Sequence, residues 1–411
     1  MGNKLKIAFV AGWPPEDKQG EANYAANIVN EYKLMYPESE IIVYAHVLEE
    51  KNIDGVIDCM NGVKLRRVTN GSNVLIRTFR SFLLSYYILK DKCNIVHYQG
   101  VHTPIYGLLF GESMLFTFFF LKILSIKQFY SLHSTWMKDD LVSLMKEKKK
   151  GKILTNFFVL YYGFYLRCVN RIMNKLLIVS CGNKSFAVDE FVIEWGLNKT
   201  NIFKENHPCH KYLEDKKSIN NLLSINLKPD ANVVLCLGYV RRDKGIHNLI
   251  NAFESIANED ESLQLIIGGE TIGEDGSKYS LELKNQISNS KYKDRINYFS
   301  QYIDQDLFQY LFSISKVVVV PYLRVIGPSG PIHYALGRSK IVVASNLGHN
   351  CNLEGVISLY DNNAIDSLIS NLDKVLNDKE FVKKINSEIE IYKNDNSWEN
   401  MSNNYHKFYN E

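Results

Sequence analysis

The chain has 411 residues, more than one hydrophobic core usually spans, so its length predicts about two domains. Hydrophobic residues make up 46% and charged residues 23%, which is ordinary globular usage and excludes a disordered chain or a collagen-like repeat. The 48 Lys and Arg against 45 Asp and Glu leave a net charge of +3. This balance excludes a nucleic-acid binder that works through bulk charge.

The 7 cysteines are scattered without C-x-x-C spacing and without a histidine cluster beside them. This pattern favours a reduced, cytoplasmic protein over a secreted disulfide scaffold or a structural zinc site. The first residues pass directly into an apolar run, so we expect no secretory signal.

The first half alternates short apolar runs with helical patterns. Short strands separated by longer helices predict βαβ units and a parallel, doubly wound sheet. A helix is expected over residues 21–34. The expected strands are residues 5–11, 40–44, 94–97, 128–132 and 176–180.

The second half repeats this pattern around a helix over residues 246–256. Its expected strands are residues 233–237, 263–267, 296–299, 316–320 and 341–345. The reading is an α/β chain with two Rossmann-like domains. We expect an N-terminal domain at 1–207, a polar linker at 208–230, and a C-terminal domain at 231–395, with 396–411 returning as a helix to the first domain.

The loop after the strand at 233–237 carries concentrated positive charge. Gly238 ends the strand, Arg241, Arg242 and Lys244 follow, and a glycine opens the next helix. Open α/β sheets bind ligands at the carboxyl ends of their strands, where cations and a helix N-terminus form a diphosphate site. The alternative is a solvated loop that happens to hold three cations.

A second helix start lies in the same half, after the strand at 316–320. Ser329 can cap this helix, and Gly330 and Pro331 follow in its first turn. Free N–H groups there would point towards an anion, although an ordinary capped helix is the alternative.

Three histidines lie near strand ends of the first half. His133 follows the strand at 128–132, and His97 and His102 flank a Tyr-Gln-Gly turn. A histidine beyond a parallel strand faces the crevice and can polarise a sugar hydroxyl, but a lone histidine is more often structural. Gly20, before the helix at 21–34, allows close approach of backbone to a ligand.

These pieces together resemble the family four retaining nucleotide-sugar glycosyltransferases, which have the GT-B fold of two facing Rossmann-like domains. The resemblance rests on residues 237–253, 319–322, 329–330 and 341–348, and on the Ser-Trp-Glu of the tail. It is strong over residues 233–348 and weaker before residue 200.

The resemblance implies a role for each candidate residue. Arg241 and Lys244 would hold the donor diphosphate, with Ser329 and Gly330 adding helix N–H groups. Gly269 and the backbone near Tyr302 would line the nucleobase pocket. His133 would stand beside the transferring sugar and Gly20 would border both substrates.

The chain departs from the family at two places. The usual pair of glutamates is replaced by Ile326 and Tyr334, and the usual arginine after the strand-end glycine is Tyr239. The chain resembles a branch with a Ser-Gly helix start and an arginine at position 241. The missing glutamates allow a catalytically silent member.

Residues 145–175 join a lysine cluster to a run of aromatic side chains. Such a segment suits an anionic bilayer surface, and the alternative is a core helix with a basic lead-in. Residues 105–121 are also apolar but too short to span a membrane, so buried core or interfacial contact is expected.

The sequence therefore predicts a metal-independent retaining glycosyltransferase of surface polysaccharide or glycoconjugate assembly. The donor is a UDP- or GDP-linked sugar, no cofactor is expected, and the acceptor is a glycan or a lipid-linked glycan. The protein would be cytoplasmic or peripheral on the inner face of the cell membrane. The alternatives are a silent GT-B binding subunit and a GT-B epimerase.

Overall fold

The computed structural model describes residues 5–14, 17, 20–47, 57–60, 62–69, 74–100, 113–211, 227–228, 230–362 and 364–411. It divides into two compact units, each with a sheet of its own. Unit 1 comprises Met1–Ser180, Ala187–Asn206 and Trp398–Glu411, and unit 2 comprises Cys181–Phe186 and His207–Ser397. The predicted linker falls mostly on residues 212–226 and 229, outside the described part. The sequence did not predict that residues 181–186 belong to the second unit.

Unit 1 is built on an eight-stranded sheet with the order β3-β4-β2-β1-β5-β6-β7-β8. Its strands pair in parallel except for β3, which is antiparallel to β4. The strands are β1 (Lys6–Ala11), β2 (Glu40–Val47), β3 (Ile57–Met60), β4 (Val63–Thr69), β5 (Ile95–Gln99), β6 (Lys127–Leu132), β7 (Lys175–Ser180) and β8 (Ile202–Asn206).

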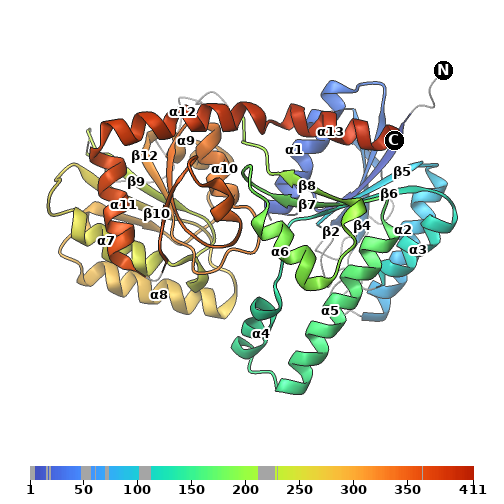
Figure 1. Ribbon diagram of the computed structural model, residues 1–411, viewed down its shortest axis with the longest axis horizontal. Helices are drawn as coiled ribbons and strands as arrows, with labels where there is room; N and C mark the ends of the chain where they lie inside the picture. Colours follow the sequence, from blue (N-terminus) through green and yellow to red (C-terminus); the bar gives the residue numbers. More distant parts are fainter. Residues whose placement is uncertain are drawn as a thin grey trace. The chain divides into compact units, whose positions relative to one another are not determined.

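Helices cover both faces of this sheet, because strand side chains alternate between two cores. Ile7 and Phe9 pack into the core under α1 (Gly20–Met35) and α13 (Trp398–Asn410), whereas Ala8 and Val10 pack into the core of the opposite face. Figure 1 shows α13 beside α1. The helices of the opposite face are α2 (Val74–Lys90), α3 (Met114–Ile123), α5 (Lys152–Ile172) and α6 (Phe186–Trp195), with α4 (Lys138–Glu147) before α5.

Unit 2 is built on a six-stranded parallel sheet with the order β11-β10-β9-β12-β13-β14. Its strands are β9 (Asn232–Leu237), β10 (Leu263–Gly268), β11 (Ile296–Phe299), β12 (Ser315–Val320), β13 (Ile341–Ser345) and β14 (Ser358–Tyr360). Its helices are α7 (Ile246–Ile256), α8 (Gly273–Asn289), α9 (Gln305–Ile314), α10 (Gly330–Gly337), α11 (Ile365–Asn377) and α12 (Lys379–Asp395). These two sheets confirm the predicted α/β class.

The sequence analysis missed β3, β4, β8 and β14, all on the outer parts of the sheets. Edge strands alternate or carry polar residues because one side meets water, so they lack the apolar run that marks a central strand. Lys64 and Arg66 in β4 and the sequence of β8 (IFKEN) show this composition.

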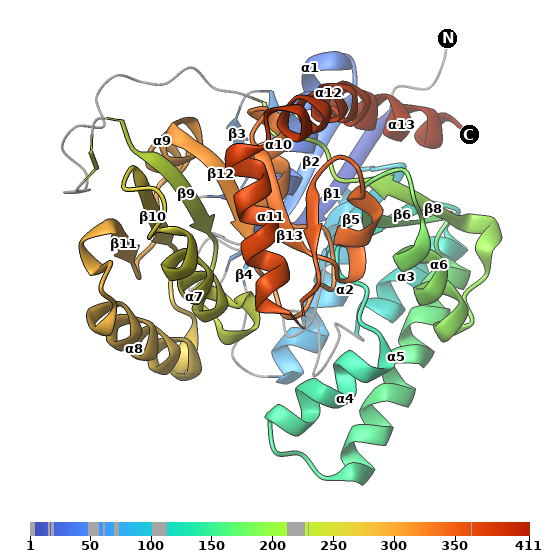
Figure 2. The ribbon, with the colours of Figure 1, turned by 60° about the vertical axis from the view of Figure 1, so that its left-hand side comes forward.

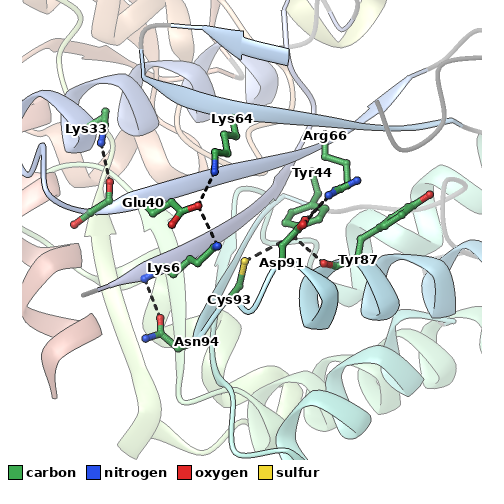
Figure 3. A network of polar contacts seen from close by, with 11 residues as sticks. Lys6, Lys33, Glu40, Tyr44, Lys64, Arg66, Tyr87, Asp91, Cys93 and Asn94 are labelled. Carbon is green, nitrogen blue, oxygen red and sulfur yellow. Dashed lines mark hydrogen bonds and ion pairs between the residues drawn. The ribbon is translucent and has the colours of Figure 1, made fainter. Parts of the chain in front are cut away.

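Polar contacts join strands of unit 1 to the end of α2 (Figure 3). Arg66 bonds Asp91 through two nitrogens, at 2.9 and 2.7 Å, and the Tyr44 hydroxyl donates to the same carboxylate at 2.8 Å. Glu40 accepts from Lys64 at 2.8 Å and pairs with Lys6 at 3.0 Å. Lys6 and Glu40 open their strands, so this pair belongs to the edge opposite the carboxyl ends and stabilises the sheet.

Candidate functional site

Backbone contacts fix the basic loop after β9 against its two neighbouring strand ends. The Val240 amide donates to the Glu270 carbonyl at 2.9 Å, and the Leu323 amide donates to the Asp243 carbonyl at 2.8 Å. Because these loops follow β10 and β12, the cations are held at the carboxyl edge of the sheet, where α/β proteins bind ligands.

Gly245 allows the loop after β9 to approach the loop after β12 closely. Its φ of 64° lies in the left-handed region, and a Cβ there would lie 1.9 Å from the Pro321 carbonyl oxygen. A side chain at this position must therefore displace the backbone of the next loop.

Gly245→Ala should destabilise unit 2 more than Gly273→Ala does. Both glycines have a positive φ, of 64° and 67°, but a Cβ at Gly273 would meet nothing within 4 Å. Backbone strain is common to both variants, so the difference measures the clash, which we expect to cost about 1–3 kcal/mol. Urea unfolding checks this, and equal stability of the two variants would contradict it.

Lys244 is the enclosed cation of the loop. Its Nζ lies 3.7 Å from the centre of the Tyr322 ring. Burial lowers the pKa of this ammonium to about 8, against the opposing charge of Asp243, and Arg241 adds to the lowering. A bound anion would therefore favour the charged form of Lys244 and raise its pKa again.

Arg241 is held by Asp243 in a two-point contact. Its Nε lies 2.9 Å and its second nitrogen 2.5 Å from the two carboxylate oxygens. Burial raises the pKa of Asp243, but the hydrogen bond from Arg241 and the charges of Lys244 and Arg241 lower it further than burial raises it. Arg242 lies apart from this group, because it bonds Glu282 and packs over the Tyr279 ring on α8.

Helix α10 begins at the predicted Ser-Gly pair, but Ser329 does not cap it with its side chain. Pro331 at the second helical position has no N–H to donate, which leaves the Ile332 amide for such a cap, and the Ser329 side chain does not accept from it. Burial raises the pKa of Tyr322 and the neighbouring Ser329 hydroxyl acts against this, so the buried Ser329 side chain lies beside Tyr322. The first-turn amides also have no intrahelical acceptor, so the helix start keeps donors for an anion.

Tyr322 brings the basic loop and the helix start together. A Cβ on Gly238 would lie 3.5 Å from the Tyr322 hydroxyl and 3.9 Å from Cγ of Pro331. Lys244 contacts the face of the same tyrosine. The ammonium, the strand-end glycine and the start of α10 therefore lie around one side chain.

Gly269 and Tyr302 occupy the loops on the other side of Gly238. A Cβ on Gly269 would lie 1.7 Å from the Gly238 carbonyl oxygen, and its amide donates to the Phe299 carbonyl at 3.0 Å. Tyr302 follows β11 and is 49% exposed. The structure thus places Gly269 in contact with Gly238 and puts Tyr302 one loop further along the edge.

In unit 1, His133 lies at the carboxyl end of β6 beside Gly100, which follows β5, and Glu21 in the first turn of α1. A Cβ on Gly100 would lie 3.0 Å from the imidazole and 2.9 Å from a carboxylate oxygen of Glu21. Burial and the charge of Asp17 raise the pKa of Glu21 to about 7. Gly20 opens α1 next to this carboxylate. The predicted residues His133 and Gly20 and the carboxylate of Glu21 therefore lie at the same edge of the sheet.

A hydrogen-bond chain orients His133. Its Nε2 lies 3.2 Å from Oε1 of Gln99, whose amide nitrogen donates to the Tyr405 hydroxyl at 3.1 Å. Tyr405 in turn donates to Glu205 at 3.0 Å. Because an amide oxygen only accepts, the contact with Oε1 of Gln99 places the His133 proton on Nε2.

His97 lies inside β5 and is fully buried, contrary to the predicted position at a strand end. Its Nδ1 contacts the Tyr409 hydroxyl at 2.6 Å and its Nε2 contacts Ser131 at 2.9 Å. Burial lowers its pKa to about 3, so the ring is neutral. This environment is that of a core histidine and argues against the predicted acceptor-side role. His102 lies outside the described residues.

The position that the resemblance gives to a glutamate is filled by an aromatic contact. The Tyr334 ring stacks on His210 with ring centres 3.6 Å apart and packs edge-on to Phe308. A carboxylate could not make these contacts, so this helix is built without the usual ribose-binding acid.

The sequence analysis did not assign roles to Tyr322, Glu21 or Gln99. Tyr322 follows β12, Gln99 ends β5 and Glu21 lies in the first turn of α1. Each contacts residues far away in the chain, and a single sequence carries no signal for those contacts.

The comparisons with known proteins agree with this fold. Residues 219–391, which lie in unit 2, match the family model of the glycosyl transferases group 1. No curated protein matches the chain. The sucrose-phosphate synthase of Thermosynechococcus elongatus superposes with a TM-score of 0.71 at 15% identity, covering 99% of this chain and 98% of that one.

Two further solved structures show the same likeness. A glycosyltransferase of Rickettsia africae gives a TM-score of 0.70 at 17% identity, covering 99% of this chain and 98% of that one. HepE of Anabaena, solved with UDP and glucose, gives 0.67 at 14% identity, covering 98% of each chain. The chain has the GT-B fold, and the family match covers residues 219–391 of its second unit.

Proposed function

We propose that the protein is a retaining glycosyltransferase that takes its sugar from a nucleoside diphosphate sugar. The observation that carries this is the meeting of Lys244 and the start of α10 around Tyr322. Cations and helix amides fixed at one place stabilise the charge that grows on a departing diphosphate, and they do so without reorganising. HepE, solved with UDP and glucose, has the same fold and supports this choice of donor.

The chain's own residues divide the work of transfer. Lys244 and Arg241 hold the leaving diphosphate, so no metal ion is needed, and the α10 amides bind its oxygens. His133, held by Gln99 through Nε2, would stand beside the transferring sugar. The departing phosphate would accept the acceptor's proton on the same face, which retains the anomeric configuration.

The acceptor is proposed to be a glycan or a lipid-linked glycan of surface polysaccharide or glycoconjugate assembly. Such an acceptor is presented at a membrane surface, and residues 145–175 carry the cations that an anionic surface attracts. None of the described helices is long and apolar enough to cross a membrane.

A thermal-shift screen with UDP, GDP, ADP and their sugars tests this proposal, because a ligand that binds only the native state raises the melting temperature. Release of nucleoside diphosphate only when acceptor is present would establish transfer, and the anomeric configuration of the product would establish retention. EDTA should change neither result. No stabilisation by any nucleotide would contradict the proposal.

Binding without turnover is the second candidate, and Tyr334 in place of the glutamate favours it. A silent subunit would show nucleotide stabilisation and no product on any acceptor panel. A GT-B epimerase would instead convert the nucleotide sugar into its epimer, with no net release of nucleoside diphosphate.

Nucleotide affinity should fall as the pH rises through 8. Lys244 has a free-state pKa of about 8, so its charge is present below that pH and is lost above it. Between pH 7 and 9 the affinity should drop by up to about tenfold. In Lys244→Arg the cation stays charged over this pH range. Any pH dependence of nucleotide binding that calorimetry measures for this variant therefore comes from titration of the ligand and can be subtracted. An identical pH profile in both proteins would refute this reading.

A further inference from the structure

The outer sides of α2, α3 and α5 expose large apolar side chains that the sequence analysis expected only in part. On each helix these residues recur at intervals of three or four, so each helix has one stripe in the core and a second stripe in solvent. Ile153 is 89% and Leu160 is 71% exposed. We name this set the three-helix face: Phe79, Phe82, Tyr86, Phe116, Phe119, Phe120, Ile123, Leu124, Ile153, Leu154, Phe157, Leu160 and Phe164.

These stripes lie on one side of unit 1. The three helices form one layer against the same face of the sheet, since all three contribute to one core. Neighbouring helices touch, α2 with α3 and α3 with α5, and the Phe82 and Phe116 rings stack with centres 5.9 Å apart. Contiguous exposed apolar surface of this kind marks an interaction site.

The charges on the three helices all have one sign. Their sequences contain no Asp or Glu, although the whole chain is nearly balanced. The cations whose side chains the structure describes are Arg80, Lys90, Lys122, Lys152, Arg167 and Arg171.

The turn that leads into α5 adds more positive charge. Lys146, Lys148, Lys149 and Lys150 are exposed there, and Asp139, Asp140 and Glu147 of α4 are the acidic residues nearby in the chain. Figures 1 and 2 both show α4 and the first half of α5 as a hairpin that projects from unit 1. The tip of this hairpin therefore carries the lysines of the turn together with the exposed Ile153.

We propose that the three-helix face inserts its apolar side chains into the surface of an anionic lipid bilayer. Phenylalanine, isoleucine and leucine enter the boundary between headgroups and acyl chains, while the surrounding cations contact anionic headgroups. A second copy of the chain fits this face less well. A two-fold contact would bring the same face of both copies together, so the cations of one copy would face those of the other, and the three helices contain no acidic residue to pair with them.

This inference extends the proposed function by naming the surface on which unit 1 meets a lipid-linked acceptor. It reaches beyond the lysine segment, since α2 and α3 supply most of the exposed phenylalanines. Its test measures lipid binding, so the nucleotide screen can fail while the lipid result stands, and the reverse also holds.

Co-sedimentation of the full chain with vesicles is the test, using phosphatidylcholine with and without phosphatidylglycerol. We expect binding that needs the anionic lipid. Phe119→Ser with Ile123→Ser, or Phe157→Ser with Leu160→Ser, should weaken it about tenfold or more. Lys149→Gln and Lys150→Gln should each weaken it about fivefold.

The matched controls are Leu281→Ser on α8 and Ile391→Ser on α12, which are 60% and 55% exposed and belong to unit 2. They should bind vesicles like the unchanged protein. Each variant is checked for folding by its far-ultraviolet circular dichroism and its melting temperature. Absence of vesicle binding, equal loss in the controls, or a dimer in solution that the same variants abolish would each overturn the proposal.

Discussion

Lys244→Ala should weaken the binding of a nucleoside diphosphate by about 1–3 kcal/mol, or roughly 5- to 150-fold in Kd. The ammonium lies against the Tyr322 ring, where the site excludes much of the surrounding water and a charge contact is stronger than at the surface. Isothermal titration calorimetry with the nucleotide found in the thermal screen measures this change.

Arg241→Ala should have a smaller effect than Lys244→Ala within the same range. Its guanidinium already neutralises Asp243 in the free protein, so part of its interaction with a ligand replaces that contact. Arg242→Ala is the matched control, because this cation of the same loop bonds Glu282 on α8 and should leave Kd unchanged. Unchanged affinity in the Lys244 and Arg241 variants, or equal loss in the Arg242 variant, would remove the site assignment.

Glu205→Gln should make the protein more stable at pH 8 by roughly 3–5 kcal/mol. Burial raises the pKa of this carboxyl to about 8, against the hydrogen bonds from Tyr405 and Ser131. A raised pKa contributes stability that is complete below pH 4.5 and is lost as the pH rises through 8. Glutamine keeps an acceptor for the Tyr405 hydroxyl and never ionises.

The difference between the two proteins should therefore grow from pH 4.5 to pH 8 and stay level above it, as urea unfolding at several pH values would show. Glu40→Gln provides a control of opposite sign. Hydrogen bonds from Lys64 and Lys6 lower the pKa of Glu40, so its contribution is present at neutral pH and is lost in acid. A Glu205→Gln difference that does not change with pH would contradict the assigned burial.

The sequence located the central strands of both units, because buried parallel strands read as short apolar runs closed by Gly, Pro or Ser. The strands at 296–299 and 341–345 and the helix at 246–256 have the predicted bounds. The same reasoning failed for His97, since a histidine near a strand end and one inside it look alike until the register is known. It also overestimated the capping of α10 by Ser329, whose side chain makes no cap hydrogen bond although Ile332 keeps its N–H.

By itself the sequence determined the α/β class, the cationic loop at 238–245 and the Ser-Gly helix start, because each is a local pattern of residue type and spacing. Only the tertiary structure decided that Tyr322 joins the loop to the helix, that Gln99 orients His133, and that α2, α3 and α5 share one exposed face. Those relations depend on which strands and helices lie side by side, and that choice is made by packing between residues distant in the chain.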